Sequence, residues 1–352
     1  MKTSFVKVSA LLLLAAGYSM LSVAAEPAKG PATVSEIAQY QGADRHERLL
    51  AAARKEGELT VYHAYPALAT VTAAFSKKYG IKVNAWRAGS EALLQRIVTE
   101  ARGNRFEVDI VQNNAPENEA LHREKLAQAV ESAFLNDLRP EASPAHKEWV
   151  GITLDVFSAA YNTRLIKKEE LPKSYQDLLD PKWKNKLGIE ADDSVWFGPL
   201  IEALGEQQGK KLFSDIVATN GISIRKGHSL LTNLVASGEV PLALTVYSWN
   251  PVQLQKKGAP VEGFLLAPVF AQFSTLAMLR KAPHPNAAAL FYDYMLSEGQ
   301  QLLADLNFVV ASRKIETPVT NEKLNFVDPR RALDMQEKWA KMFESILVKN
   351  VK

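Results

Sequence analysis

The feature that most constrains the fold is a regular alternation of short β-rich runs and amphipathic helical segments. Strands are predicted at residues 59–62, 81–86, 108–111, 151–161, 187–190, 222–225, 242–246 and 274–279. Helical periodicity marks segments between them, including 66–79, 196–204, 229–237 and 286–296, and a charged final helix at 328–348. Such alternation is typical of α/β proteins with mainly parallel sheets. At 352 residues, two domains are expected rather than one.

The first 25 residues have the layout of a secretory signal peptide. Lys2 and Lys7 give a charged start, residues 11–16 are apolar, and residues 23–25 fit a small-residue cleavage site. The apolar run is too short to span a bilayer. We therefore expect export, with cleavage after Ala25 and no membrane anchor.

Charge and cysteine content exclude several classes of protein. The formal net charge is +3, and the predicted signal carries two of the lysines, so the remaining chain is close to neutral. It contains no block rich in Lys and Arg, which argues against binding to nucleic acid or to a membrane surface. The chain has no cysteine, so disulfides, thiolate metal sites and lipidation at an N-terminal cysteine are excluded. We expect an unlipidated, monomeric protein in the periplasm.

The common enzyme motifs are missing. The sequence contains no Gly-x-Gly-x-x-Gly, no phosphate-binding P-loop, no His-Glu-x-x-His and no Gly-x-Ser-x-Gly. Gly227, His228 and Ser229 resemble a nucleophile elbow only in part, because Leu231 stands where the second glycine belongs. The pair Asp192 and Asp193 is interpreted as a helix N-cap rather than as a metal-binding or acid/base pair. We expect neither catalysis nor a cofactor.

Polar and aromatic residues gather where the predicted strands end. Ligands of open parallel sheets bind beyond the carboxyl ends of the strands, beside helix starts. The candidate ligand-binding residues are therefore His63, Tyr65, Gly89, Ser90, Asn113, Asn114, Ser194, Trp196, His228, Ser229, Tyr247 and Trp249. The starts at Gly89 and Gly227 combine a glycine with a hydroxyl, and exposed backbone N–H groups there suit a carboxylate or phosphate.

Several of these residues also have a purely structural interpretation. Ser90 could cap its helix, and His63 could hydrogen-bond a nearby carbonyl group. Tyr247 and Trp249 could pack between domains as well as line a cleft. Trp196 is the candidate that most favours a core position.

Specific motifs make the chain recognisable. They lie at residues 87–97, 108–110, 149–151, 161–163, 171–178, 180–184, 235–240 and 283–288. Together they resemble type 2 periplasmic binding proteins of ABC importers, in the subgroup that contains ferric-ion, phosphonate, thiamine and sugar-phosphate binders. The resemblance covers nearly all of the chain after the signal.

The resemblance implies an α/β fold of two lobes joined by a two-strand hinge. We expect lobe 1 to comprise residues 26–156 and 269–352, and lobe 2 to comprise residues 157–268. A ligand that bridges both lobes would favour the closed form. The implied partners are an ABC permease and its ATPase. A sensor subunit that presents its ligand to a membrane receptor is an alternative with the same fold.

The resemblance leaves the ligand open. Ferric-ion binders of this family carry adjacent tyrosines before a tryptophan, and the matching positions here are Tyr247, Ser248 and Trp249. The serine argues against bare ferric iron, because a hard trivalent cation requires several anionic oxygens. The sequence therefore favours a small anionic organic solute, carboxylated or phosphorylated. Ferric iron, free or chelated, with Tyr247 as its ligand, is the second prediction.

Overall fold

A computed structural model describes residue 1, residues 32–317 and residues 323–348. The predicted signal peptide and its cleavage site lie outside the described residues, apart from Met1. Residues 33–352 form one compact unit, and the account below concerns this unit. Its described helices include none that is long and apolar enough to cross a bilayer.

The predicted α/β fold is confirmed. The first elements are α1 (Val34–Gln39), α2 (Arg45–Glu56), β1 (Glu58–His63), α3 (Leu68–Tyr79), β2 (Lys82–Arg87), α4 (Ser90–Arg102), β3 (Ile110–Asn114), α5 (Ala115–Arg123) and β4 (Ala127–Gln128). Next come β5 (Val150–Asn162), β6 (Leu187–Glu190), α6 (Ser194–Ala203), α7 (Glu206–Asn220), β7 (Ser223–Arg225), α8 (His228–Ser237), β8 (Leu242–Tyr247), α9 (Trp249–Gln255) and β9 (Val261–Phe264). The last are β10 (Phe270–Leu279), α10 (Pro285–Leu296), α11 (Glu298–Asp305), β11 (Val309–Val310), β12 (Asn325–Phe326) and α12 (Pro329–Phe343).

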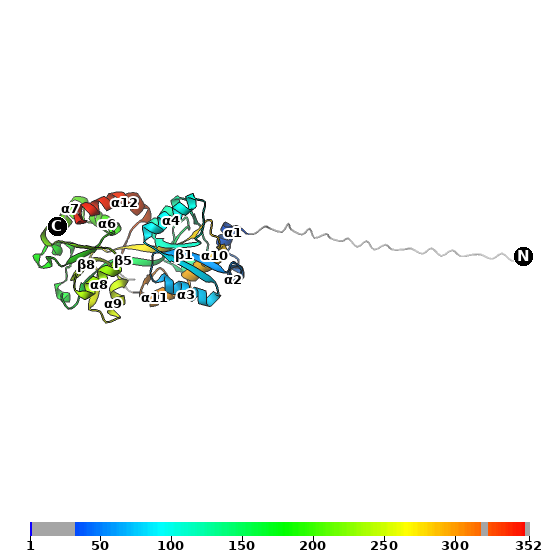
Figure 1. Ribbon diagram of the computed structural model, residues 1–352, viewed down its shortest axis with the longest axis horizontal. Coiled ribbons are helices and arrows are strands. Elements are labelled where there is room, and N and C mark those ends of the chain that lie inside the picture. Colours follow the sequence, from blue (N-terminus) through cyan, green and yellow to red (C-terminus); the bar gives the residue numbers. More distant parts are fainter. Residues whose placement is uncertain (2–31, 318–322, 349–352) are drawn as a thin grey trace. The chain divides into compact units, whose positions relative to one another are not determined.

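One strand joins the two halves of the sheet. In the described part, the main strand order is β2-β1-β3-β10-β5-β8-β6-β7. Residues 150–156 of β5 pair antiparallel with β10, and residues 157–162 pair with β8 and β9. The outer pairs β1–β2, β1–β3, β6–β7 and β6–β8 are parallel. Figure 1 shows β5 running between β8 on one side and β1 on the other.

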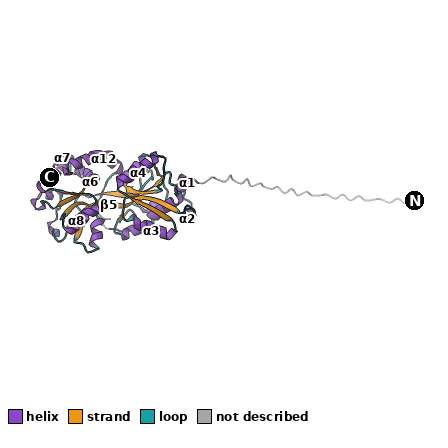
Figure 2. Ribbon diagram, in the orientation of Figure 1, coloured by secondary structure: helices purple, strands orange, loops and turns teal. Residues whose placement is uncertain are grey.

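Helices cover both faces of this sheet (Figure 2). All thirteen residues of β5 and all ten of β10 are buried, as expected for strands that are packed on both faces. The hydrophobic side chains form two large cores. The first surrounds β1, β3 and α10, and the second surrounds β6, α6 and α7.

The last helix joins the second core. Trp339 and Phe343 of α12, together with Ile346 and Leu347 after it, are buried with α6 and α7, whereas the sequence analysis placed residues 269–352 in lobe 1. The amphipathic face of α12 finds its apolar partner there, and the helix also packs against α5. The division into lobes at residues 156 and 268 stays a prediction.

Two local predictions differ from the structure. The third strand begins at Ile110 rather than at Val108, and it extends past its predicted end at residue 111 to include Asn113 and Asn114. The N-cap of α4 is Gly89, so Ser90 is the first helical residue and does not cap the helix. Its hydroxyl has another partner, described below.

The packing of α12 against α6 depends on a residue without a side chain. A Cβ atom at Gly198 would lie 2.3 Å from Cγ and Cδ2 of Trp339, whose side chain is 1% exposed. We expect Gly198→Ala to lower the free energy of unfolding by about 1–3 kcal/mol through overpacking. This occurs although alanine is the better helix former by ~1 kcal/mol.

Urea unfolding measures this effect. Gly103→Ala is the control, because Gly103 has an ordinary φ of −79° and the nearest atom to its Cβ position is 3.4 Å away. That control should change stability by less than about 0.5 kcal/mol. Equal stability of the two variants would contradict the tight α6–α12 contact.

Candidate functional site

The end of β1 is built by its own turn. The imidazole Nδ1 of His63 lies 2.9 Å from the carbonyl oxygen of Tyr65, and burial lowers the pKa of His63. The backbone N–H groups of Ala64 and Tyr65 donate to Oε1 of Gln112 at 3.1 and 2.8 Å. Nδ1 of His63 therefore interacts with the backbone of this turn. The side chain of Tyr65, which follows, packs against Trp249 and Phe308.

Gly89, Ser90, Asn113 and Asn114 lie together, as the positions of their strand ends predicted. Nδ2 of Asn113 donates to the Ser90 carbonyl at 3.0 Å, and Nδ2 of Asn114 donates to Oγ of Ser90 at 3.1 Å. No atom lies within 4 Å of a Cβ position at Gly89, so the start of α4 is open. The two amides orient the serine.

Carboxyl groups, however, surround this helix start. Glu91 lies in the first turn of α4, and Glu117 lies in the first turn of α5. Burial raises the pKa of Glu117 to about 7, the nearby charge of Glu91 adds to the rise, and Oε2 of Glu117 has no hydrogen-bond partner among the described residues. An anion bound at the start of α4 would therefore lie close to the carboxyl groups of Glu91 and Glu117.

Glu190, Asp193 and His228 meet where β6 ends and α6 and α8 begin. Their nearest ligand atoms all lie within 4.8 Å of one another, and Nε2 of His228 is 3.3 Å from Oδ1 of Asp193. Asp193 occupies the N-cap position of α6, but its side chain makes no capping hydrogen bond. The predicted N-cap position of Asp193 is confirmed, but its carboxylate faces His228 instead of the first turn of the helix.

Burial sets the protonation of these three groups. Glu190 is 4% and Asp193 is 5% exposed. Burial raises the pKa of both carboxyls, and each also feels a neighbouring carboxylate. Burial lowers the pKa of His228 to about 3, so the imidazole is neutral at neutral pH. A neutral imidazole beside two carboxyls offers nitrogen and oxygen lone pairs.

Tyr247 lies directly over His228. The two ring centroids are 3.9 Å apart, and the phenol oxygen accepts a hydrogen bond from Nε2 of Gln272 at 3.1 Å. Burial raises the pKa of Tyr247 well above its usual value, and the charges of Asp155, Asp193 and Glu190 act in the same direction. The phenol stays protonated unless a cation replaces its proton.

Trp249 connects Tyr247 to the first core. Its indole Nε1 donates to Oδ1 of Asp155 at 3.1 Å, and its ring makes edge contacts with Tyr65 and Phe308 at centroid distances of 5.8 and 4.7 Å. Burial raises the pKa of Asp155 to about 7, while the bond from Trp249 lowers it. Asp155 thus lies buried in the middle of β5 beneath both aromatic residues.

We call these seven residues the central cluster: Tyr65, Asp155, Glu190, Asp193, His228, Tyr247 and Gln272. Four buried polar atoms of the cluster make no well-aligned hydrogen bond to the described residues, namely Tyr65 Oη, Asp193 Oδ2, His228 Nδ1 and Gln272 Oε1. Thr153 lies near Tyr65, and Thr245 lies near Asp193 and His228, but without hydrogen-bond geometry. Oγ1 of Thr153, on the same strand as Asp155, and Oγ of Ser248, directly after Tyr247, also make no well-aligned hydrogen bond to the part of the chain that the structure describes. Buried polar groups normally find partners, so this concentration indicates a place where a ligand binds.

The remaining predicted residues lie outside the cluster. The side chain of Trp196 packs among Tyr175, Phe197 and Phe213 and is 2% exposed, so its prediction as a ligand contact is corrected to a core role. Ser229 is exposed at the start of α8, where its hydroxyl accepts a 3.5 Å hydrogen bond from Asn250. Ser194 is half-buried in the first turn of α6.

Sequence reasoning missed Asp155, Glu190 and Gln272. The sequence feature that could have identified them is an acidic or amide residue within a predicted strand that is otherwise mostly apolar, as in the segment 150–162. A buried carboxyl in such a strand requires a partner, but the sequence does not show which strands are neighbours. The pairing of Asp155 with Gln272 across β5 and β10 is a property of the sheet register.

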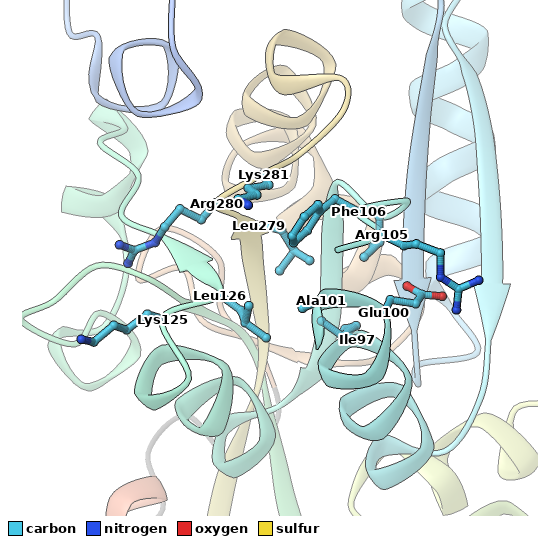
Figure 3. A pocket seen from close by; sticks show the side chains of 11 residues that line it. Ile97, Glu100, Ala101, Arg105, Phe106, Lys125, Leu126, Leu279, Arg280 and Lys281 are labelled. Carbon is cyan, nitrogen blue, oxygen red and sulfur yellow. The ribbon is translucent and has the colours of Figure 1, made fainter. Parts of the chain in front are cut away.

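An apolar cavity of about 260 Å³ lies in the first half of the sheet, at the end of β3 that is opposite to Asn113 and Asn114 (Figure 3). Its walls include Ile97, Val108, Leu126 and Leu279, at the start of β3 and the end of β10. The predicted ligand residues lie at the other end of β3. Figure 3 shows Lys125 and Arg280 extending to one side of the pocket and Arg105 to the other. We place the candidate site at the central cluster because unpaired polar atoms converge there.

The donor set of the central cluster suits a cation. It offers carboxylate and phenol oxygens and an imidazole nitrogen, which are the donors that hard and borderline metal ions prefer. Among the described residues, no Lys or Arg lies within ion-pair distance of Asp155, Glu190 or Asp193. The nearby Lys226 pairs with Asp192 at 3.4 Å and is largely exposed.

Comparison with known proteins places this site in context. Residues 109–337 match a family model described as bacterial extracellular solute-binding protein. The Fe(3+)-binding periplasmic protein of Serratia marcescens is 25% identical over 244 residues, which cover 66% of this chain and 71% of that protein. A putative 2-aminoethylphosphonate-binding periplasmic protein of Salmonella typhi is 24% identical over 287 residues, covering 78% and 82% of the two chains.

Solved structures show the same fold. The periplasmic binding protein AfuA from Actinobacillus pleuropneumoniae, with fructose-6-phosphate bound, superposes with a TM-score of 0.73 at 20% identity, covering 83% of this chain and 99% of that one. Iron-bound HitA from Pseudomonas aeruginosa gives a TM-score of 0.68 at 22% identity, covering 80% and 99%.

The buried charge of Asp155 makes stability depend on pH. Its pKa is about 7 in the folded protein and close to 3.9 in an unfolded chain. The folded state therefore holds a proton that the unfolded state has released between these values, and stability falls as pH rises towards 7. Asp155→Asn keeps an acceptor for Trp249 and removes the charge. We expect ligand-free Asp155→Asn to be more stable than wild type at pH 8, by about 2–4 kcal/mol at most.

Urea unfolding between pH 4 and pH 8 tests this expectation, and the difference should shrink towards zero at pH 4. Asp215→Asn, at an exposed position paired with Lys211, is the control and should change stability by less than about 1 kcal/mol throughout. A constant difference at all pH values would contradict a buried, ionisable Asp155.

Proposed function

The chain belongs to the bacterial extracellular solute-binding protein family, and on that premise we propose that its cargo is ferric iron, free or chelated, held at the central cluster. The ion would bind the phenolate of Tyr247, the imidazole of His228 and the carboxylates of Asp193 and Glu190. Relatives bind ferric iron, phosphonate or sugar phosphate, so the family alone leaves the cargo open. The chemistry of the cluster favours the metal.

One observation carries the proposal: among the described residues, no Lys or Arg lies within ion-pair distance of three buried carboxyls. Asp155, Glu190 and Asp193 are each at most 5% exposed. Placing uncompensated charge in a protein interior is costly, and the raised pKa values express that cost. A bound cation supplies the missing charge, which lowers the pKa values again and fills the unpaired lone pair at Asp193 Oδ2.

The donor types favour ferric iron over softer or larger ions. Fe(III) is a hard ion that prefers anionic oxygens. Ser248 stands where ferric-ion binders of this family carry a second tyrosine, which by itself argues against iron. Glu190 and Asp193 offer two anionic oxygen donors beside Tyr247. They supply the anionic ligands that the strand end at Tyr247 and Ser248 does not provide by itself.

An anionic solute finds less support at the same helix starts. The N–H of Gly227, before α8, already donates to Oε1 of Glu190 at 2.8 Å, so the protein's own carboxylate takes the place predicted for the ligand. The open start of α4 at Gly89 remains available, although Glu91 and Glu117 lie beside it. A ferric chelate would reconcile both observations, with its metal at the central cluster and its carboxylates near Ser90.

The remaining parts of the proposal follow the family. Related proteins are periplasmic, and proteins of this kind serve an ABC permease and its ATPase. We propose the same partners and compartment here, with binding and release but no turnover. Presentation of the ligand to a membrane receptor is the alternative, and a permease and ATPase encoded beside this gene would favour import.

Tyr247 provides the direct test of the cargo. Mixing the protein with ferric citrate should produce a visible charge-transfer band, because a phenolate bound to Fe(III) absorbs visible light. Tyr247→Phe should abolish the band, since the ring stays and only the oxygen is lost. Tyr161→Phe is the matched control, because Tyr161 bonds Glu262 through its own hydroxyl away from the cluster.

The carboxylates should affect affinity rather than colour. Asp193→Asn and Glu190→Gln should each weaken ferric binding by about tenfold or more, the effect expected when a charge-assisted interaction worth ~1.5–3 kcal/mol is lost. A protein that stays colourless with ferric citrate and is stabilised only by organic phosphates or phosphonates would overturn the iron assignment and support the anion.

Ligand binding should also close the protein around β5. The two halves of the sheet are joined through β5 and the segment before β10, and such connections suit hinge motion. Small-angle scattering should show a smaller radius of gyration with ferric citrate present. An unchanged radius in the presence of a bound, coloured complex would exclude closure while leaving the cargo assignment intact.

A further inference from the structure

A second group of metal-binding side chains lies on α5 and in the segment before β5. It consists of Glu119, His122 and His146, whose nearest ligand atoms all lie within 4.8 Å of one another. It shares no residue with the central cluster. We propose that these three residues form a separate site for a divalent first-row transition ion such as Zn²⁺.

The spacing of the three residues fits a single ion. Glu119 and His122 are three residues apart on α5, so both lie on one face of the helix. Oε2 of Glu119 is 3.3 Å from Nε2 of His146. Two ligand bonds of 2.0–2.1 Å at a tetrahedral angle put the ligand atoms about 3.3 Å apart. The pair therefore already has the separation of two ligands on one zinc ion.

The groups behind the ligands are those of a metal site. Oε2 of Glu148 is 2.9 Å from Nδ1 of His122, which fixes the proton on Nδ1 and leaves the Nε2 lone pair free. A guanidinium nitrogen of Arg280 holds the other oxygen of Glu148 at 3.0 Å. The Trp149 indole N–H donates to Oε2 of Glu119 at 3.1 Å. Carboxylates behind ligating histidines orient the ring and raise its basicity in zinc sites.

The two imidazoles are held in a form that can bind a metal. Their rings are stacked, with centroids 3.8 Å apart and planes 11° apart, an arrangement that two positive rings would oppose. Glu119 is 3% exposed, and the nearest guanidinium, that of Arg123, lies at 3.8 Å and is bonded to Asp334.

Binding requires one proton to move. The Glu148 N–H donates to Nδ1 of His146 at 3.1 Å, so the proton of this neutral ring is on Nε2, facing Glu119. When the ion takes the Nε2 lone pair, that proton transfers through solvent to Nδ1, and the bond from the Glu148 amide is given up. No net proton is released at this ring. Glu119 and His122 are therefore the first two ligands, His146 the third, and water completes the tetrahedron.

Calorimetric titration with ZnCl₂ tests the site. The titration uses His228→Gln/Asp193→Asn protein, because the central cluster could bind zinc itself. One equivalent of Zn²⁺ should bind, and His122→Gln in that background should weaken binding by at least about tenfold. Glu148→Gln, which changes only the group behind the ligand, should weaken it by about 10–100-fold. His46→Gln, at an exposed histidine, is the matched control and should leave affinity unchanged.

A second measurement separates this site from the cargo site. His122→Gln in the otherwise wild-type chain should leave the Tyr247-dependent ferric band unchanged, because the two clusters share no ligand. His122 is partly exposed, with 31% of its side chain accessible, so the variant is expected to fold, and its circular dichroism spectrum checks this. Zinc affinity that is equal in the His228→Gln/Asp193→Asn protein with and without His122→Gln, or no zinc binding to that protein at micromolar concentrations, would overturn the proposal.

Discussion

The fully buried strand β5 is the constraint on which the rest of the structure depends. Its first seven residues complete the sheet of the first core, and its last six begin the sheet of the second core. A strand buried on both faces admits few polar residues. Asp155 is nevertheless part of β5, close to the point after Val156 where the pairing partner changes from β10 to β8. Gln272 reaches Asp155 from β10, the partner before this change, and Trp249 reaches it from the end of β8, the partner after it.

The electrostatics of the central cluster follow from that position. Carboxyls that are removed from water, with no basic side chain within ion-pair distance, either keep their protons or acquire a cation. The same burial that raises the pKa values of Asp155 and Tyr247 and lowers that of His228 creates neutral donors that a metal can deprotonate or coordinate directly. A site of this kind is stabilised by its ligand, which couples binding to the stability of the folded state.

The second group of ligands, at Glu119 and His122, shows a different use of the same residue types. There the charges are balanced, since Arg123 and Arg280 lie beside the acids, and the histidines are half-exposed. The central cluster gathers charge without compensation, as a cargo site requires, whereas the group on α5 is preorganised by neighbours that bond its ligands. The two arrangements predict different responses to the ligand. The central cluster loses protons when its ligand binds, whereas the group on α5 only moves one proton within His146 and releases none.

The sequence by itself determined the element types, the α/β class, the long strand at residues 151–161 and the strand ends at which polar residues gather. These depend on local periodicity and on short-range motifs, which a linear sequence carries in full. The sequence could not show that Asp155 faces Gln272, that Glu190 bonds the backbone before α8, or that α12 crosses to the second core. Those relations join residues between about 35 and 140 positions apart, and only the register of the sheet and the packing of its helices bring them together. The change from an anionic to a cationic ligand rests on them, because the charge of a site is the sum of side chains that only the tertiary structure makes neighbours.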